Sequence, residues 1–562
     1  MRRILLFASL SFMFAALASA AGPRVDIVIG ETAPPLEKRA AEDIAADLKK
    51  VYDAEVKIAT AAPEDAENVI FIGSLETNEQ TKKQIAESWP KLSNQGHVLR
   101  TIKYQGKPAL FIGGGSPVAA YWGAAEYAHH LGIRAMLYGD LSPVFAKPFT
   151  LEGFDIMLDS RSDRVWSAMN SDPTGYTSWG LADQKRLLRQ LSRLKYNRMR
   201  IGVHPWQPFV HFEIDGVKKN TGVLWHGWQF PVDGDTAGRA AFKGAKFFEN
   251  PDFAGKTTYE QRLDVGQKLL RGLIEESHAL GISVDLATSP MEFPREFAPI
   301  LPGSIPVTEP GNLAVKSLEK RDAMDGLTSH EKLQMNAYKA AYPGIDDSYA
   351  ESGTQNWASD LIRDWNYTAY TTSRRGFNMS VTRETVCRDL VTPICGEGVD
   401  ASVLKALEQI QRSGLITEQL DRTFFVLGPD MVMKHYATIA PPPDGWSQVR
   451  ANYLGAMNDM YRANSRAREG GRSYTLYLAR RCEFGYEYMN CVDATRKAGI
   501  AKSKKDTAEQ RMQLEKAIES MNAACSALAA VARDQSDRGM IVVCNEFGYK
   551  ALQKELEKLD AE

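Results

Sequence analysis

Between residues 161 and 352 the sequence alternates buried strands with amphipathic helices in four successive units. This alternation is typical of a (β/α) barrel. The strands are predicted at 164–169, 198–203, 282–287 and 345–350, and the helices between them at 181–194, 259–280 and 330–341. A complete barrel needs eight units and about 250 residues. Because only four units are visible, we expect a barrel-like domain that is truncated.

The regions on either side of this domain have different patterns. Residues 21–160 combine strands near 25–30, 69–73 and 110–113 with helices at 36–52 and 119–131, which predicts a small α/β sandwich. From about residue 375 onward, apolar residues recur every three or four positions and no strand repeat is evident. We therefore predict a barrel-like domain at 161–374 and an all-α domain at 375–562.

The first twenty residues have the pattern of an export signal. Arg2 and Arg3 form a basic start, residues 4–17 are apolar, and Ala18-Ser19-Ala20 fits the small-residue cleavage rule. We expect residues 1–20 to be a signal peptide and the mature protein to be periplasmic, extracellular or attached to the cell surface. No later segment has the length and apolar character of a membrane span.

The charge balance and the cysteine spacing argue against two classes of function, nucleic-acid binding and zinc binding. The formal net charge is -2, with 68 basic and 70 acidic residues, which argues against a nucleic-acid-binding protein. No CxxC pair has a histidine partner, so we predict neither a metal nor a cofactor. Disulfides could close the short loops Cys387/Cys395 and Cys482/Cys491, and buried free thiols in a helical core are the alternative.

Polar and aromatic residues follow each predicted strand of the barrel-like domain. Asn170 follows the first strand, His204 and Trp206 the second, Glu292 the third and Glu351 the fourth. Because the chemistry of such barrels lies in the loops after the carboxyl ends of the strands, we expect these side chains to share a pocket. For each residue taken alone, core packing or an ordinary surface role is the alternative.

Several segments resemble a group of glycoside hydrolases. The N-terminal segments "IVIGETAPPLEKRAAEDIAADL" and "LFIGGGSPVAAYWGAAEYAHHLGIRAM" resemble the accessory domain that precedes the barrel of β-hexosaminidases and bacterial α-glucuronidases. The segments "SWGLADQKRLLRQLSRLKYNRMRI", "HPWQPFVHF" and "SPMEFPREFAPILPGS" resemble the first half of an α-glucuronidase-like barrel. The resemblance covers about residues 24–352 and implies the same order of domains.

The resemblance also implies a role for Glu351. In these families a carboxylic acid at the end of the fourth strand protonates the leaving glycosidic oxygen, and Glu351 in "GIDDSYAESG" occupies the matching position. The adjacent Asp-Glu pair of the hexosaminidases is absent, because Asp346 and Asp347 precede Glu351 by several residues. This departure argues against the substrate-assisted N-acetyl mechanism.

Glycosidic bond cleavage commonly needs a second carboxylate. Glu292 is our candidate, with Asp285 and Asp346 as alternatives. If Glu292 is not catalytic, we expect it to form a salt bridge with Arg295 or Arg200. Three kinds of side chain could bind the sugar, besides Asn170. The rings of Trp206, Trp225 and Trp228 could stack on it, and His204, His211 and His226 could donate hydrogen bonds. The guanidinium of Arg200 or Arg239 could hold a uronate through two hydrogen bonds. A three-histidine metal site at His204, His211 and His226 matches no known spacing.

Two functions follow from these features. The first is an exported glycoside hydrolase that cleaves a complex polysaccharide or glycan by carboxylate acid/base catalysis. The second is a non-catalytic carbohydrate-binding or structural relative with a degenerate barrel. Both predict a carbohydrate ligand, and a homodimer could cover the open edge of a truncated barrel.

Overall fold

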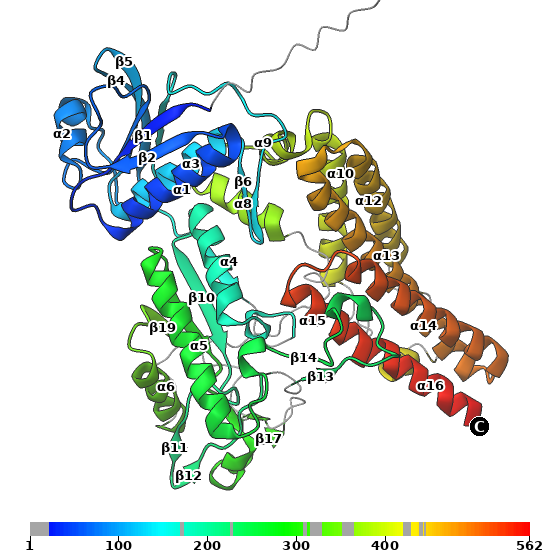
Figure 1. Cartoon of the computed structure of the whole chain (residues 1–562). Coiled ribbons are helices and arrows are strands. Elements are labelled where there is room, and N and C mark those ends of the chain that lie inside the picture. The colour runs from blue at the N-terminus through cyan, green and yellow to red at the C-terminus, as the bar shows by residue number, and fades with distance from the viewer. Residues whose placement is uncertain are drawn as a thin grey trace, which may run out of the picture.

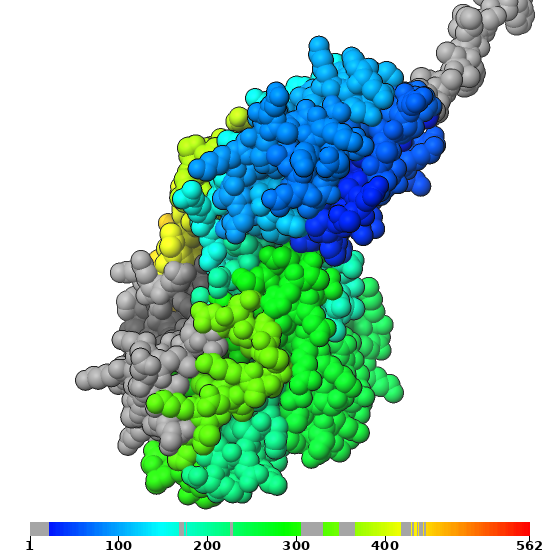
Figure 2. Space-filling view, turned by 90° about the vertical axis from the view of Figure 1, so that its left-hand side faces the viewer, coloured from blue at the N-terminus to red at the C-terminus, as the bar shows by residue number. Residues whose placement is uncertain are grey.

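The computed structural model describes residues 22–168, 173–224, 229–306, 312–314, 329–350, 365–419, 429–435, 437, 442 and 445–561. These residues form a mixed α/β structure with a helical C-terminal half (Figure 1). The N-terminal domain stacks on the barrel-like domain in the space-filling view (Figure 2). In the described part of the chain, no helix is long and apolar enough to cross a membrane.

The N-terminal domain is a six-stranded sheet between helices. Its strand order is β2 (Glu55–Ala59), β1 (Arg24–Val28), β3 (Val69–Ile72), β5 (Lys107–Gly114), β4 (His97–Tyr104) and β8 (Asp155–Leu158). Helices α1 (Pro35–Tyr52) and α3 (Pro117–His130) share one apolar cluster with the sheet, and α2 (Glu79–Ile85) contributes to a second. The predicted α/β layers are confirmed, whereas β2, β4 and β8 were not predicted.

The barrel-like domain contains the predicted strand–helix repeat. Its strands β9 (Val165–Ala168), β10 (Arg198–Val203), β15 (Ser283–Thr288) and β19 (Asp347–Ala350) form one sheet in the order β19-β15-β10-β9, and every neighbouring pair is parallel. The helices between them are α4 (Leu181–Arg193), α5 (Tyr259–Ala279) and α6 (Ser329–Ala341). Each of these elements lies within a few residues of its predicted position.

Short strands occupy the connections after β10 and β15. The long connection between β10 and α5 contains two antiparallel pairs. The first is a hairpin of β11 (Glu213–Ile214) and β12 (Val217–Lys218), and the second joins β13 (Phe230–Pro231) to β14 (Phe247–Phe248). The strands β16 (Glu292–Pro294), β17 (Ile305–Pro306) and β18 (Asn312–Ala314) form a three-stranded sheet after β15. A separate hairpin of β6 (Arg134–Met136) and β7 (Gly139–Leu141) follows α3.

Helices make up the described chain after residue 365. They are α8 (Trp365–Arg375), α9 (Arg383–Cys395), α10 (Asp400–Gln419), α11 (Pro429–His435), α12 (Trp446–Arg466), α13 (Glu469–Ser503), α14 (Thr507–Ala529), α15 (Gln535–Val543) and α16 (Lys550–Ala561). All six cysteines are buried free thiols, which is the second of the two alternatives that the sequence left open.

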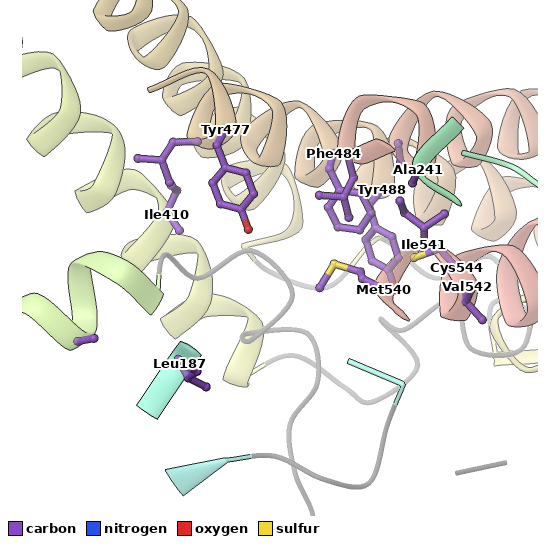
Figure 3. Packing of buried hydrophobic residues seen from close by; sticks show 14 of the residues in the cluster. Leu187, Ala241, Ile410, Tyr477, Phe484, Tyr488, Met540, Ile541, Val542 and Cys544 are labelled. Carbon is purple, nitrogen blue, oxygen red and sulfur yellow. The ribbon is translucent and has the colours of Figure 1, made fainter. Parts of the chain in front are cut away.

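One apolar cluster extends from the barrel-like domain into the helical region. It includes Leu187 of α4, Ile410 of α10, Tyr477 of α13 and Met540 of α15 (Figure 3). The helical region therefore shares its core with the barrel-like domain.

Buried charges at the end of α4 hold the N-terminal domain in place. Arg193 Nη2 lies 2.8 Å from Asp47 of α1, and Arg193 Nε lies 3.3 Å from Asp140 of β7. Lys195, which follows α4, pairs with Glu126 of α3, and both side chains are at most 4% exposed. Arg374 of α8 reaches the same carboxylate at 2.8 Å. Three parts of the chain therefore meet at Glu126.

Candidate active site

The loops after β10 and β15 meet at one edge of the four-stranded sheet. The two strands are parallel neighbours, with Val203 beside Thr288, so their carboxyl ends point the same way. His204 follows Val203 directly, and Glu292 begins β16 a few residues beyond Thr288. Parallel pairing thus brings together two residues that lie 88 positions apart in the sequence.

Two ring nitrogens converge on one oxygen of Glu292. Trp206 Nε1 donates a hydrogen bond to Glu292 Oε2 at 3.1 Å, and His204 Nδ1 lies 3.2 Å from the same oxygen. The rings of His204 and Trp206 are stacked, with centroids 5.0 Å apart and an interplanar angle of 15°. The stacked rings therefore fix the direction of the carboxylate, and the Trp206 N–H, as a donor, favours its charged form.

Exposure separates the three side chains. The side chains of Glu292 and His204 are 27% and 24% exposed, so a ligand can reach them. Trp206 is only 1% exposed. The expectation that Trp206 offers an open ring to a sugar differs from the structure, in which its indole is stacked on His204 and buried. Its role here is to support Glu292.

The loop that carries His204 and Trp206 closes on itself. The His204 backbone N–H donates to Gln207 Oε1 at 2.9 Å, and the Gln207 N–H donates back to the His204 carbonyl at 2.9 Å. Gln207 is fully buried and its amide also donates to the Leu224 carbonyl at 2.9 Å. Sequence reasoning missed Gln207, because a glutamine in a loop carries no signal that its side chain turns inward.

Asp285 and Asp346, the two alternatives to Glu292, form hydrogen bonds within or beside the sheet. Asp285 lies in β15 beside Arg200 of β10, is 3% exposed, and accepts a hydrogen bond from Arg198 Nη1 at 2.6 Å. Asp346 precedes β19 and accepts from the Val284 backbone N–H at 2.6 Å. Although burial opposes ionisation, hydrogen bonds from Val284 and His278 lower the pKa of Asp346. Both carboxylates stabilise the sheet. Of the three described acids, Glu292 therefore remains the candidate for the second catalytic carboxylate.

The remaining predicted residues are only partly placed. Arg200 lies within β10, next to Ser167 of β9 and Asp285 of β15. His211 Nδ1 lies 3.0 Å from the Tyr259 hydroxyl, away from His204 and its partners. Four predicted site residues, as well as Trp225, lie outside the described residues: Asn170, His226, Trp228 and Glu351. Ala350, the last residue of β19, lies beside Thr288 in the sheet.

One group of side chains in the described ranges has the spacing of metal ligands. Glu126, His129 and His130 of α3 each offer a ligand atom, and these atoms lie within 4.8 Å of one another. Lys195 and Arg374 already neutralise Glu126, and despite burial they hold its pKa well below the usual range. A divalent cation would meet these positive charges at close range, so the group is an ion-pair junction and does not suit a metal.

Comparison with known proteins supports one part of the predicted resemblance. Residues 19–127 match the family described as "Glycosyl hydrolase family 67 N-terminus". No curated protein matches the chain in sequence. A solved family GH115 4-O-methyl-α-glucuronidase, described as specific for decorated arabinogalactans, is 13% identical with a TM-score of 0.47, over 93% of this chain and 79% of its own.

A second solved structure covers nearly the whole chain. It is a GH138 enzyme targeting pectin rhamnogalacturonan II, 12% identical with a TM-score of 0.48, over 96% of this chain and 98% of its own. Such low identities and TM-scores establish neither the fold nor the activity of this chain. The predicted resemblance to α-glucuronidase-like glycoside hydrolases is thus confirmed by the family match of the N-terminal domain.

Proposed function

We propose that the chain is a glycoside hydrolase whose reaction takes place at the carboxyl edge of the β10–β15–β19 sheet. The observation that carries this proposal is the Glu292 carboxylate, held by Trp206 and facing solvent beside His204. A partly exposed, oriented carboxylate at the end of a barrel-type strand is what glycosidic bond cleavage requires. The glycosyl hydrolase match of residues 19–127 supports the same class of activity.

The two carboxylates would have different roles. Glu292 receives the Trp206 N–H, which stabilises the ionised form, so it would act as the base or the nucleophile. Glu351 would act as the general acid, since the predicted resemblance places the acid after the fourth strand and β19 ends at Ala350. His204 would bind the sugar, because its imidazole is partly exposed next to the carboxylate.

The substrate that we propose, within the predicted class of complex polysaccharides and glycans, is a polysaccharide that carries uronic acids. The family match connects the N-terminal domain with the predicted α-glucuronidase resemblance. Arg200 in the neighbouring strand supplies a guanidinium that could bind a uronate through two hydrogen bonds. Asn170, His226 and Trp228 remain proposed as further sugar-binding residues.

The test is release of reducing sugars from plant polysaccharides with and without uronic acid branches. We expect release only from the branched substrates, and Glu351→Gln should lower the rate on the order of 10²-fold or more because it removes the transferred proton. If the wild type binds glycans on an array but releases no sugar from any of them, the non-catalytic carbohydrate-binding alternative replaces this proposal.

Export and dimerisation are separate proposals. The basic, apolar and small-residue pattern of residues 1–20 supports export of a chain that starts near Ala21. The sheet order ends at β9 and β19, and a second copy could cover one of these edges. The mass of the exported chain's N-terminal peptide tests the first proposal, and light scattering after gel filtration tests the second. A peptide that begins at Met1, or a monomer at all concentrations, would contradict them.

A further inference from the structure

One face of α6 donates hydrogen bonds to the backbone of both loops that form the candidate active site. Gln334 Nε2 donates to the carbonyl of Glu292 at 2.9 Å, and the Tyr338 hydroxyl donates to the carbonyl of His204 at 3.1 Å. The Tyr342 hydroxyl, just after the last residue of α6, donates to the carbonyl of Phe209.

The spacing of these donors explains how one helix serves two loops. Gln334, Tyr338 and Tyr342 are four residues apart, which places them on one side of a helix over about 12 Å. Gln334 and Tyr338 are fully buried and Tyr342 is 2% exposed. The His204 carbonyl also accepts from the Gln207 N–H, so Tyr338 adds a second donor, from a helix, to a carbonyl that the loop itself already binds. Helix α6 therefore sets the distance between the loop that follows β10 and the loop that follows β15.

A buried lysine also donates hydrogen bonds to the backbone of the same loop. Lys219, which follows β12, is 1% exposed, and its Nζ donates to the carbonyl of Gln207 at 2.5 Å and to that of Val210 at 2.7 Å. The loop has no partner strand over these residues in the described sheets, so side-chain donors replace the ladder of hydrogen bonds that a sheet would supply.

We infer that α6 and Lys219 set the position of the His204–Trp206 loop relative to Glu292, and that Gln334, Tyr338, Tyr342 and Lys219 are positioning residues. None of the hydrogen bonds described for them reaches a reacting group directly; each acts through the loop backbone. The consequence for catalysis rests on the proposed function, whereas the consequence for the geometry of Trp206 does not.

The experiment follows the indole of Trp206 in the full-length protein labelled with 5-fluorotryptophan. The ¹⁹F resonance of Trp206 is assigned by its loss in Trp206→Phe. We expect Tyr338→Phe, Tyr342→Phe and the double variant to shift or broaden this resonance, because each removes only a hydroxyl donor. Tyr196→Phe is the matched control, since its buried hydroxyl donates to the Ala369 carbonyl at 3.3 Å in another part of the domain.

The outcomes separate this inference from the proposed function. An unmoved Trp206 resonance in the folded double variant overturns the inference, and Tyr342→Phe alone decides it if Tyr338→Phe does not fold. If the wild type is active, we expect kcat to fall on the order of tenfold in Tyr338→Phe, with KM nearly unchanged and Tyr196→Phe unaffected. A shifted resonance in a protein that cleaves no glycan supports the inference and contradicts the proposed function.

Discussion

Glu37 gives the stability of the N-terminal domain a specific dependence on pH. It lies in the first turn of α1 and is 1% exposed. Its Oε1 accepts a hydrogen bond from the Thr77 hydroxyl at 2.8 Å, whereas Oε2 has no hydrogen-bond partner in the described structure. Burial raises the pKa of Glu37 to about 7, and the Thr77 hydrogen bond only partly opposes this shift. In the folded state the carboxyl group is therefore mostly protonated below about pH 7 and mostly charged above it.

The raised pKa determines both the sign and the size of the effect. The folded state binds the proton more tightly than the unfolded chain, so the contribution of Glu37 to stability is fully present below its ordinary pKa of 4.5. It is lost as the pH rises through about 7. A shift of about 2.5 pKa units corresponds to about 3 kcal/mol. Glu37→Gln, which is neutral at every pH, should remove this loss.

The assay compares melting temperatures of the wild type and Glu37→Gln at pH 5 and pH 8. We expect similar stability at pH 5 and a more stable variant at pH 8, with protection of β1 and β3 against hydrogen exchange as the local readout. Glu42→Gln is the control, because Glu42 lies on the exposed side of the same helix. A variant that is equally destabilised at both pH values would show that Glu37 is charged and well solvated in the folded protein.

Three further predictions concern buried charges and thiols. Lys195→Met should destabilise the protein by about 3 kcal/mol, because it leaves Glu126 with fewer positive partners. In a double-mutant cycle, Glu126→Gln in the same chain should recover part of this loss. Additive effects of the two substitutions would contradict the pairing. Burial lowers the pKa of Lys219 to about 7, so the ¹³Cε resonance of Lys219, assigned by its loss in Lys219→Met, should titrate near pH 7, and a midpoint near the ordinary lysine value of 10.5 would contradict this. The six buried thiols should stay unreactive toward a thiol reagent until the protein unfolds, and rapid labelling of the native protein would count against their burial.

Strong periodic patterns made the barrel-like domain predictable. The strand β10 was predicted with its observed bounds because Met199, Ile201 and Val203 alternate with less apolar residues and all three are buried. The strands β2 and β4 were missed because they are partly exposed and mix polar with apolar residues, so neither a strand nor a helix period stands out. Ile541-Val542-Val543 lies in α15, where packing outweighs the strand preference of branched residues.

The candidate site was predicted in its location but not in its internal arrangement. The structure brings His204, Trp206 and Glu292 together, because parallel strands place their carboxyl ends side by side; that these residues form a ligand site stays a prediction. The sequence does not say which way an indole in a loop turns, and so the burial of Trp206 was not foreseen. The pairing of Glu126 with Arg374 joins residues 248 positions apart, and no local spacing encodes it.

The most direct test of the account is the rate at which Glu292→Gln releases sugar from a substrate that the wild type cleaves. The glutamine keeps the shape of the side chain and can still accept the Trp206 N–H, but it can serve neither as a base nor as a nucleophile. We expect a loss on the order of 10²-fold or more with an unchanged melting temperature, while Glu275→Gln on the exposed side of α5 keeps the wild-type rate. If Glu292→Gln releases sugar as fast as the wild type, Glu292 is not a catalytic carboxylate, and the reaction does not take place at this site.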